Sequence, residues 1–315
     1  MHILVVNDDG PPSRDASPYV HSLVHELQTQ GHIVTVVLPN QQRSWIGKAH
    51  FVGEVVKATY FSPGEPFRFE GTEHQTPQGL SNDTHSSSSS SNGAQDHRPW
   101  MLVNSTPAGC VQIGLHHYPH YQQEGRPIPI DLVISGPNLG ANATALFSLS
   151  SGTIGGAMEA VLCGKRSIAL SFEPVARDDV CNPVQITDAC RHAVHLIKHL
   201  YHSWDEGVEL YSVNIPLRSA PSGDRKVMYT RIRPNRWLAA SPFQVVSPSG
   251  DATEQNADSS LLLRWAPDLS DIHGSMDRTS NADDDWAVRE GKTSVTPLKA
   301  NFMHAVHCKG EIHLK

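Results

Sequence analysis

Two adjacent carboxylates in the sequence are the groups best placed to do chemistry. Asp8 and Asp9 follow an apolar run at residues 2–6, with Asn7 between the run and the pair. Ionised carboxylates a few ångström apart repel each other, so a fold that holds both needs a positive charge between them. A divalent cation such as Mg²⁺ or Mn²⁺ supplies that charge and prefers oxygen ligands. The pair therefore predicts part of a metal site, although an Asp-Gly sequence is also typical of a turn.

Asparagines and glycines after a later apolar run suit the same site. Residues 135–142 contain Asn138, whose amide oxygen is a neutral ligand for a hard cation, and glycines that permit close approach of the backbone. A tight loop explains the same composition, because Gly, Pro and Asn are turn residues. Asn7 and Asn142 are secondary candidates.

A candidate anion site follows at residues 151–160, which predict a helix with small residues at its N-terminus. Ser151, Gly152 and Thr153 present hydroxyls and free backbone N–H groups there, and the helix dipole favours a negative charge. Ordinary N-capping by Ser or Thr explains the same residues. Both interpretations stay open on these residues alone.

The elements that must position these groups begin with a parallel crossover. The patterns predict a strand at 2–6, a helix at 17–30 and a buried strand at 33–38. Ser17 is the expected N-cap of the helix, and Pro18 suits its first position. A strand–helix–strand unit of this length implies a right-handed parallel connection.

Further alternation extends this unit into an α/β fold. Ordered structure is expected to resume near 100–103, and apolar runs predict strands at 130–134, 167–171 and 209–215. Helices are expected to open at 106–107 and to cover 151–160 and 187–203. Parallel sheets bind ligands beyond the carboxyl ends of their strands, so Asp8, Asp9 and residues 39–44 are expected at one edge. The sequence therefore predicts an α/β fold with a mostly parallel sheet.

The chain is expected to form one domain over residues 1–315, with its core at about 1–220. Residues 221–315 predict β-hairpins or arms, with short strands at 227–232, 261–265 and 294–298 and polar loops at 247–260 and 270–285. The serine-rich insert at 74–98 is too polar to pack and is predicted to be disordered.

Composition excludes several classes of protein. With 25 basic and 32 acidic residues the net charge is −7, which argues against nucleic-acid binding through a basic surface. The five cysteines lack a CxxC pair, which predicts reduced, mostly buried thiols. Neither a signal peptide nor an apolar run of about 18 residues is present, so we expect no membrane span and a cytoplasmic protein. A solvated helix face is expected for His192, His195, His199 and His202.

Several segments together resemble the SurE-like nucleotidase and phosphatase family, most closely its eukaryotic, fungal-type branch. They lie at 3–10, 39–44, 106–111, 131–142, 151–159 and 294–298. The resemblance implies a Rossmann-like three-layer α/β sandwich with C-terminal arms, assembled as a homodimer or homotetramer. It also implies a hydrolase of nucleoside monophosphates or other phosphomonoesters, of the 5′-nucleotidase or acid phosphatase type.

The resemblance assigns roles to individual residues. One divalent metal, Mg²⁺ or Mn²⁺, would be coordinated by Asp8, Asp9, Ser44 and Asn138. The phosphate would be bound by Ser151, Gly152 and Thr153. Asp8 and Asp9 would also be the catalytic residues, one of them accepting a proton from the attacking water.

Two departures and three alternatives bear on this interpretation. Trp45 follows Ser44 where the family often has glycine, and Pro137 stands where it often has a β-branched residue. A response-regulator receiver needs an aspartate where the sequence has Ser135. A haloacid-dehalogenase-type phosphatase needs a second aspartate where it has Gly10. A non-catalytic nucleotide-sensing or scaffold protein that keeps the fold is the remaining alternative.

Overall fold

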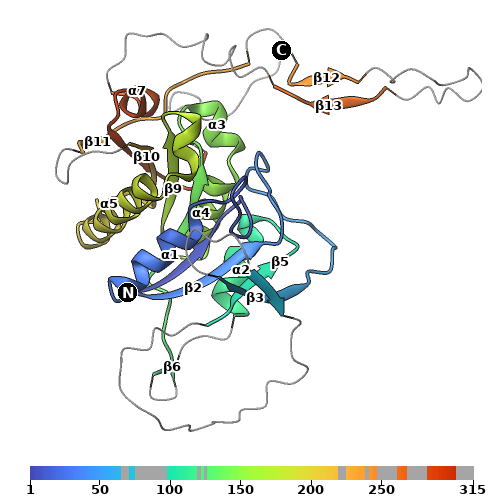
Figure 1. Cartoon of the computed structure of the whole chain (residues 1–315), viewed down its shortest axis with the longest axis vertical. Coiled ribbons are helices and arrows are strands. Elements are labelled where there is room, and N and C mark those ends of the chain that lie inside the picture. The colour runs from blue at the N-terminus through green and yellow to red at the C-terminus, as the bar shows by residue number, and fades with distance from the viewer. Residues whose placement is uncertain are drawn as a thin grey trace, which may run out of the picture.

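The computed structural model describes most of the chain and builds it around one long sheet (Figure 1). The described residues are 1–64, 71–74, 98–118, 122–123, 126–218, 225–237, 241–246, 261–267 and 282–302. They form a ten-stranded sheet in the order β11-β14-β10-β9-β8-β1-β2-β5-β3-β4. The insert predicted at 74–98 lies almost wholly outside the described residues.

Six neighbouring strands make the parallel centre of the sheet. They are β10 (Leu210–Leu217), β9 (Arg166–Pro174), β8 (Leu132–Leu139), β1 (His2–Val6), β2 (Ile33–Pro39) and β5 (Trp100–Val103). Antiparallel pairs β5–β3 and β3–β4 extend one edge, with β3 at Ala58–Pro63 and β4 at Gly71–His74. The expected mostly parallel sheet is confirmed.

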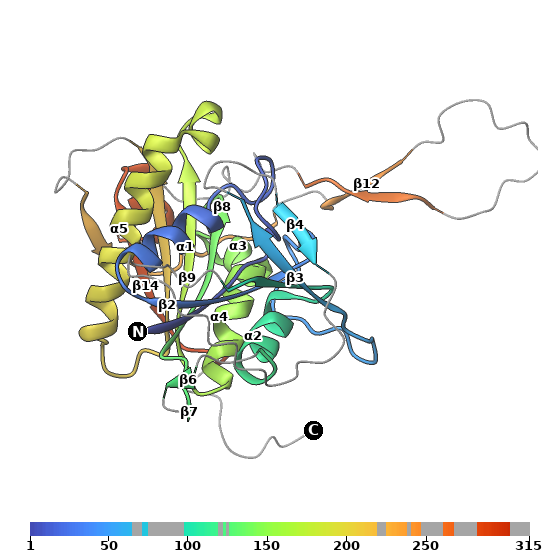
Figure 2. The same ribbon diagram turned by 60° about the horizontal axis from the view of Figure 1, so that its bottom comes forward.

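Helices cover both faces of the sheet and complete the three layers (Figure 2). On one face α1 (Val20–Thr29) and α5 (Pro183–His202) pack over alternate strand residues that include Ile3 and Val5. On the other face α2 (Pro107–His116) and α4 (Gly152–Leu162) pack over the intervening residues, Leu4 and Val6. Because successive strand side chains point to opposite faces, the all-apolar run in β1 is buried on both sides.

The strand order reverses at β1, whose neighbours are β2 and β8. The crossover helix α1 leads to β2 on one side of β1, and the chain returns through β5 and α2 to β8 on the other side. Such a switch point leaves a crevice beyond the carboxyl ends of the strands, where α/β proteins bind ligands. The strands β1 and β8 border this crevice. Asp8 comes shortly after the end of β1, and Asn138 is the next-to-last residue of β8.

Two expected boundaries near this crevice were wrong. The N-cap of α1 is Tyr19, without a side-chain cap bond, because the Ser17 hydroxyl donates to the Gly10 carbonyl instead. Strand β8 continues through the expected loop to Leu139, since its backbone keeps pairing with β9 across an irregularity between Ser135 and Asn138.

The C-terminal part of the chain contributes to the core as well as to an arm. Strand β14 (Thr293–Leu298) pairs antiparallel with β10 inside the main sheet, and β11 (Val227–Tyr229) pairs with β14. The short strands expected at 227–232 and 294–298 therefore lie in the main sheet. The hairpin of β12 (Phe243–Val245) and β13 (Leu263–Trp265) does project from the body in Figures 1 and 2. Division of the chain into a single domain stays a prediction.

Short elements complete the described chain. They are β6 (Gln122–Gln123), β7 (Arg126–Pro127), α3 (Ala145–Ser150), the 3-10 helix η1 (Arg177–Cys181) and α7 (Asp284–Arg289). Across these ranges no helix has the length and apolar character needed to cross a membrane. Four of the five cysteines are described and all four are free thiols, of which Cys110 and Cys190 are buried.

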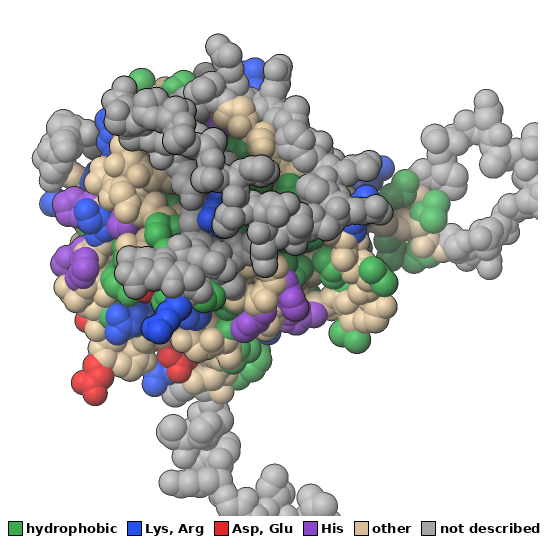
Figure 3. All heavy atoms as spheres, turned by 90° about the horizontal axis from the view of Figure 1, so that it is seen from below, with side chains coloured by type: hydrophobic (Ala, Val, Ile, Leu, Met, Phe, Trp, Pro, Cys, Tyr) green, Lys and Arg blue, Asp and Glu red, His purple; other side chains and the backbone are tan. Residues whose placement is uncertain are grey.

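Basic and acidic side chains are mixed on the face of the molecule seen in Figure 3. On the face in Figure 3, the described lysines and arginines form small separate groups among other side chains, not one continuous basic field. This distribution agrees with the net charge of −7. It gives no support to electrostatic nucleic-acid binding on the part of this face that is described.

The expectation that four histidines of α5 form a solvated face is wrong for one of them, His192. His195, His199 and His202 are exposed, but the Nε2 atom of half-buried His192 lies 2.9 Å from the Thr293 hydroxyl of β14. Burial, and then the charges of Arg225 and His195, together lower the pKa of His192 to about 4.

This pKa predicts a loss of stability in acid. The neutral ring stabilises the fold fully above the ordinary histidine pKa of about 6.5, and that contribution disappears as the pH falls toward 4. Allowing for partial exposure, we expect the neutral His192 ring to contribute about 1–2 kcal/mol to the free energy of unfolding. Urea unfolding of the His192→Gln protein should therefore show a smaller stability loss between pH 7.5 and 4.5 than the wild type. His199→Gln, on the exposed face of α5, is the control; identical pH profiles for all three proteins would contradict the assignment.

Candidate metal and phosphate site

The turn after β1 is held by the side chain of Asn7. Its Nδ2 donates to the Gly10 carbonyl at 2.9 Å and to the Ser17 hydroxyl at 3.2 Å, while its Oδ1 accepts from the Gly10 N–H at 3.0 Å. Both ends of the amide are thus used within the turn. Asn7, a secondary candidate for the site, has a structural role that fixes the backbone on which Asp8 and Asp9 stand.

Asp8 is bound by the N-terminus of α4. Its Oδ1 accepts from the Thr153 hydroxyl at 2.5 Å, and the backbone N–H groups of Gly152 and Thr153 also donate to its carboxylate. A Cβ at Gly152 would come within 2.8 Å of the Asp8 Cβ, so only glycine permits this approach. Burial of the carboxyl group raises the pKa of Asp8 despite these donors.

Asp9 points toward the end of the neighbouring strand β8. Its Oδ2 accepts from the Leu139 N–H at 2.8 Å, and its Oδ1 takes no hydrogen bond from the described residues. Burial, and then the charge of Asp8, raise the pKa of Asp9 well above its usual range. Both side chains are 2% exposed, and neither is in an ion pair with a described lysine, arginine or histidine.

A bulge in β8 directs Asn138 toward the same place. Two residues, Gly136 and Pro137, stand opposite one residue of β9, and a Cβ at Gly136 would overlap the Leu170 carbonyl. The Asn138 Nδ2 donates to the carbonyls of Leu139 and Gly140, so its amide orientation is fixed. The Oδ1 atom then accepts no hydrogen bond from the described residues and is available as a ligand.

The loop that carries Ser44 is anchored on both sides. The Arg43 N–H donates to the Asp8 carbonyl at 2.6 Å, and the Gly47 N–H donates to the Ser150 carbonyl at 2.9 Å. Farther along, Lys48 forms an ion pair with buried Glu159 of α4 at 2.6 Å. These contacts hold the exposed Ser44 side chain at the rim of the crevice.

A cavity of about 560 Å³ opens at this point, within the usual size of small-molecule pockets. Of the residues predicted from sequence, those that line it are Asp8, Ser44, Asn138, Asn142 and Ser151. Asp9, Gly152 and Thr153 are not among the lining residues; Gly152 and Thr153 contact Asp8, and Asp9 contacts Leu139. The Ser151 hydroxyl caps α4 by accepting from the Ile154 N–H, and the Asn142 amide donates to Ser171.

The residues present fit a hard divalent cation. Two buried carboxylates without a cationic partner in the described chain adjoin a free amide oxygen at Asn138 and a free hydroxyl at Ser44. All four are oxygen donors, which suits Mg²⁺ or Mn²⁺ rather than a soft metal. Among the described residues, no three or more His, Cys, Asp or Glu side chains are grouped so that they could hold a metal ion, so the neutral oxygens of Asn138 and Ser44 would have to complete the ligand set of the two carboxylates.

Sequence reasoning missed the far wall of the cavity. Glu173 at the end of β9 and Asp285, Val288 and Arg289 of α7 line it. Glu173 accepts from the Ala141 N–H at 2.5 Å and so supports the 138–142 segment. The start of α7 lies in a stretch expected to be loop, yet its acidic first turn and basic last turn are a helix signature that the sequence contains.

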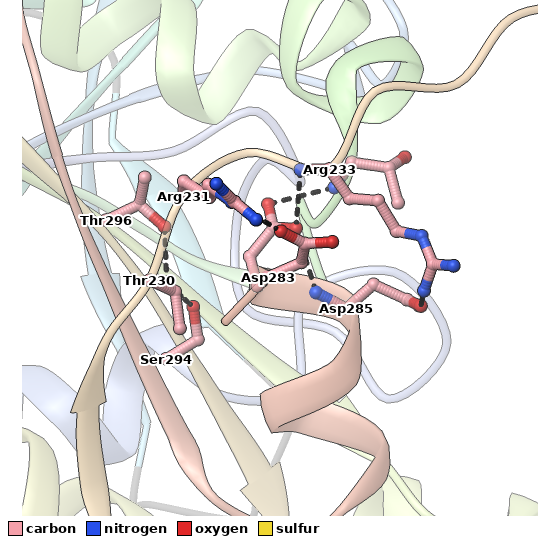
Figure 4. Close-up of polar contacts among 9 residues, drawn as sticks. Thr230, Arg231, Arg233, Asp283, Asp285, Ser294 and Thr296 are labelled. Atoms are coloured by element: carbon pink, nitrogen blue, oxygen red, sulfur yellow. Dashed lines mark hydrogen bonds and ion pairs between the residues drawn. The ribbon is translucent and has the colours of Figure 1, made fainter. Parts of the chain in front are cut away.

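Helix α7 and its N-cap residue are fixed by ionic contacts, of which that between Arg233 and Asp285 is buried (Figure 4). In Figure 4 the Asp285 Oδ2 accepts from Arg233 at 3.2 Å, and Arg231 pairs with Asp283 at 3.0 Å. The Asp285 Oδ2 also lies 2.9 Å from Arg289 within α7.

Asp284 joins α7 to the cavity wall. Its carboxylate accepts from the backbone N–H groups of Thr144, Arg233 and Asp285, and burial raises its pKa to about 6. Because Thr144 also lines the cavity, the far wall and the 138–144 segment form one connected structure.

Comparison with known proteins identifies relatives that match most of the chain. The family model described as survival protein SurE matches residues 3–239. The 5′-nucleotidase SurE of Methanocella arvoryzae is 30% identical over 95% of this chain and 92% of its own length. The SurE protein of Aquifex aeolicus has a crystal structure that covers 96% of this chain and 95% of its own, with a TM-score of 0.59 and 23% identity, a likeness of fold.

A longer relative comes from yeast. The probable tubulin–tyrosine ligase PBY1 of Saccharomyces cerevisiae is 33% identical over the full length of this chain. This chain spans only 43% of that protein.

The carboxylate pair predicts how cations and a single substitution change stability. Asp9→Asn keeps an oxygen for the Leu139 N–H and removes the repulsion of Asp8. At pH 8 without metal, its melting temperature should exceed that of the wild type by a few degrees, because loss of the repulsion should raise the free energy of unfolding by about 1–2 kcal/mol. Mg²⁺ or Mn²⁺ should raise the melting temperature of the wild type but not of this variant.

Asp131→Asn is the matched control, because Asp131 also accepts one backbone N–H, that of His2, at 2.8 Å. This variant should keep the response to cations. A wild-type melting temperature that neither cation changes would count against the metal site.

Proposed function

Because the chain belongs to the SurE family, we propose that it is a metal-dependent phosphomonoesterase acting on nucleoside monophosphates or related phosphomonoesters. The observation that carries the proposal is the pair of buried carboxylates, Asp8 and Asp9, beside a cavity of about 560 Å³. Relatives along nearly the whole chain are named 5′-nucleotidases, which supports the substrate class.

The cation would be held by Asp8, Asp9, Ser44 and Asn138. Bound there, a divalent cation supplies Lewis-acid stabilisation of phosphate charge and lowers the pKa of a water molecule. Asp8 lines the cavity and Asp9 does not, so the Asp8 carboxylate is the better placed of the two to accept a proton from the attacking water.

The N-terminus of α4 would bind the phosphate only together with the cation. Its N–H groups and Thr153 already bind the negative charge of Asp8, so a second anion at this helix end is repelled unless a cation offsets the first. Ser151 lines the cavity and is the member of the predicted set nearest to a substrate. Phosphate binding and cation binding are therefore expected to be coupled.

A homodimer or homotetramer formed through C-terminal arms, and a cytoplasmic location, remain part of this proposal. The hairpin β12–β13, with exposed Phe243 and Leu263, is the segment whose apolar surface suits such assembly.

Hydrolysis assays test the proposal directly. The purified chain should release phosphate from p-nitrophenyl phosphate and from AMP with Mg²⁺ or Mn²⁺, and a chelator should abolish release reversibly. Asp8→Asn should lower kcat/KM by about 10²–10⁴-fold, since it removes a ligand and a proton acceptor. Asp188→Asn, a carboxylate paired with Arg191 on α5, should retain wild-type activity.

Full activity after chelation would contradict the role of the cation. Absence of hydrolysis with every substrate and cation, combined with tight nucleotide binding, would instead favour the nucleotide-sensing or scaffold alternative.

A further inference from the structure

A tryptophan next to the candidate ligand Ser44 adopts an unusual backbone conformation. Trp45 has a φ of 64°, in the left-handed region that costs energy for a residue with a bulky side chain. A glycine there would avoid the cost. Such strain persists where the surrounding structure fixes it, and it is concentrated at ligand-binding sites. The side chain that the conformation presents is therefore the feature to explain.

Other aromatic rings surround Trp45. Its ring centroid lies 5.5 Å from that of Phe147 in α3, 5.5 Å from that of Trp265 in β13, and 6.4 Å from that of Trp237. Trp237 is near-parallel to Trp45, at 28°, and it meets Trp265 edge to face at 6.1 Å. Rings in contact at these distances restrict one another, so Trp45 is held in one orientation before any ligand arrives.

Two of these rings face the cavity. Trp45 and Phe147 line it together with Asp8, Ser44 and Asn138, whereas the other rings do not. Trp237 is 36% exposed and Trp265 is 41% exposed, and they support Trp45 from outside the cavity. The aromatic wall, defined as Trp45 and Phe147, thus borders the same space as the candidate metal ligands.

A purely structural role explains only part of this cluster. Attachment of the β12–β13 hairpin, whose apolar side chains are seen at the right of Figure 3, accounts for Trp265 and for its contact with Phe243 at 5.2 Å. It does not explain why Trp45 takes a strained conformation beside Ser44, nor why Phe147 of α3 lines the cavity.

We propose that the aromatic wall is a stacking subsite for the planar group of a phosphate monoester, a nucleobase or an aryl ring. The inference rests on the proposed phosphomonoesterase function and adds the selection of the group that carries the phosphate. Aromatic side chains stack on any planar π system, and this tolerates different bases because each has such a face. A preorganised wall stabilises the bound substrate without the cost of ordering a mobile side chain.

Steady-state kinetics of the full chain with three substrates tests the inference. AMP and phenyl phosphate carry planar groups, and β-glycerol phosphate does not. The wild type should prefer at least one planar substrate over β-glycerol phosphate by about 10-fold or more in kcat/KM. Trp45→Leu and Phe147→Leu should each reduce that preference about 10-fold, chiefly through KM. Phe243→Leu, the same substitution on a ring outside the cavity, should keep the wild-type preference.

The results distinguish a nucleobase subsite from an aryl subsite, and failure of the subsite proposal from failure of the proposed function. A preference for AMP over phenyl phosphate identifies a nucleobase subsite, and the reverse identifies an aryl subsite. Equal kcat/KM for all three substrates, or Leu variants with the wild-type preference, would overturn the aromatic wall while leaving the phosphomonoesterase intact. If no substrate is hydrolysed, the proposed function fails. Calorimetric titration with AMP and β-glycerol phosphate then decides the subsite, and equal affinities would refute it.

Discussion

Burial of two like charges at the end of β1 is the constraint on which the surrounding structure depends. Each carboxylate accepts hydrogen bonds from a different element. The Thr153 hydroxyl and the N–H groups at the N-terminus of α4 donate to Asp8, and the Leu139 N–H at the end of β8 donates to Asp9. These bonds lower the cost of burial but leave the pKa of each group raised, because hydrogen bonds do not replace a counter-charge. The fold therefore brings β1, β8 and α4 together around two carboxylates that have no cationic partner among the described residues.

Close backbone approach makes this convergence possible. Gly152 lets α4 reach Asp8, and Gly136 lets β8 bulge against β9 so that Asn138 turns toward the crevice. In both places a methyl group would collide with atoms of a neighbouring element. The geometry of the site is thus determined by packing between backbone segments and not by the ligand residues alone.

Apolar patterns were sufficient to predict the elements that carry the site, and long-range contacts limited the rest. The spacing of Val20, Leu23, Val24 and Leu27 located α1, but its first turn was misplaced because Ser17 serves the distant Gly10 turn. The sheet edge followed from the topology rule, which brought Asp8 and Asn138 together. Residues of α7 were missed as pocket residues, because only tertiary structure brings a C-terminal helix to the end of β1.

The position of α7 has a consequence for the synthesis of the chain. Asp8 leaves the ribosome well before Asp285 and Arg289, which line the same cavity. The parallel centre of the sheet is complete once β10 has emerged, but β14, which is needed to position α7, has not yet been made. A nascent chain can thus assemble the carboxylate pair while the cavity is still open on one side. The cavity is closed on that side only after α7 and β14 have been made.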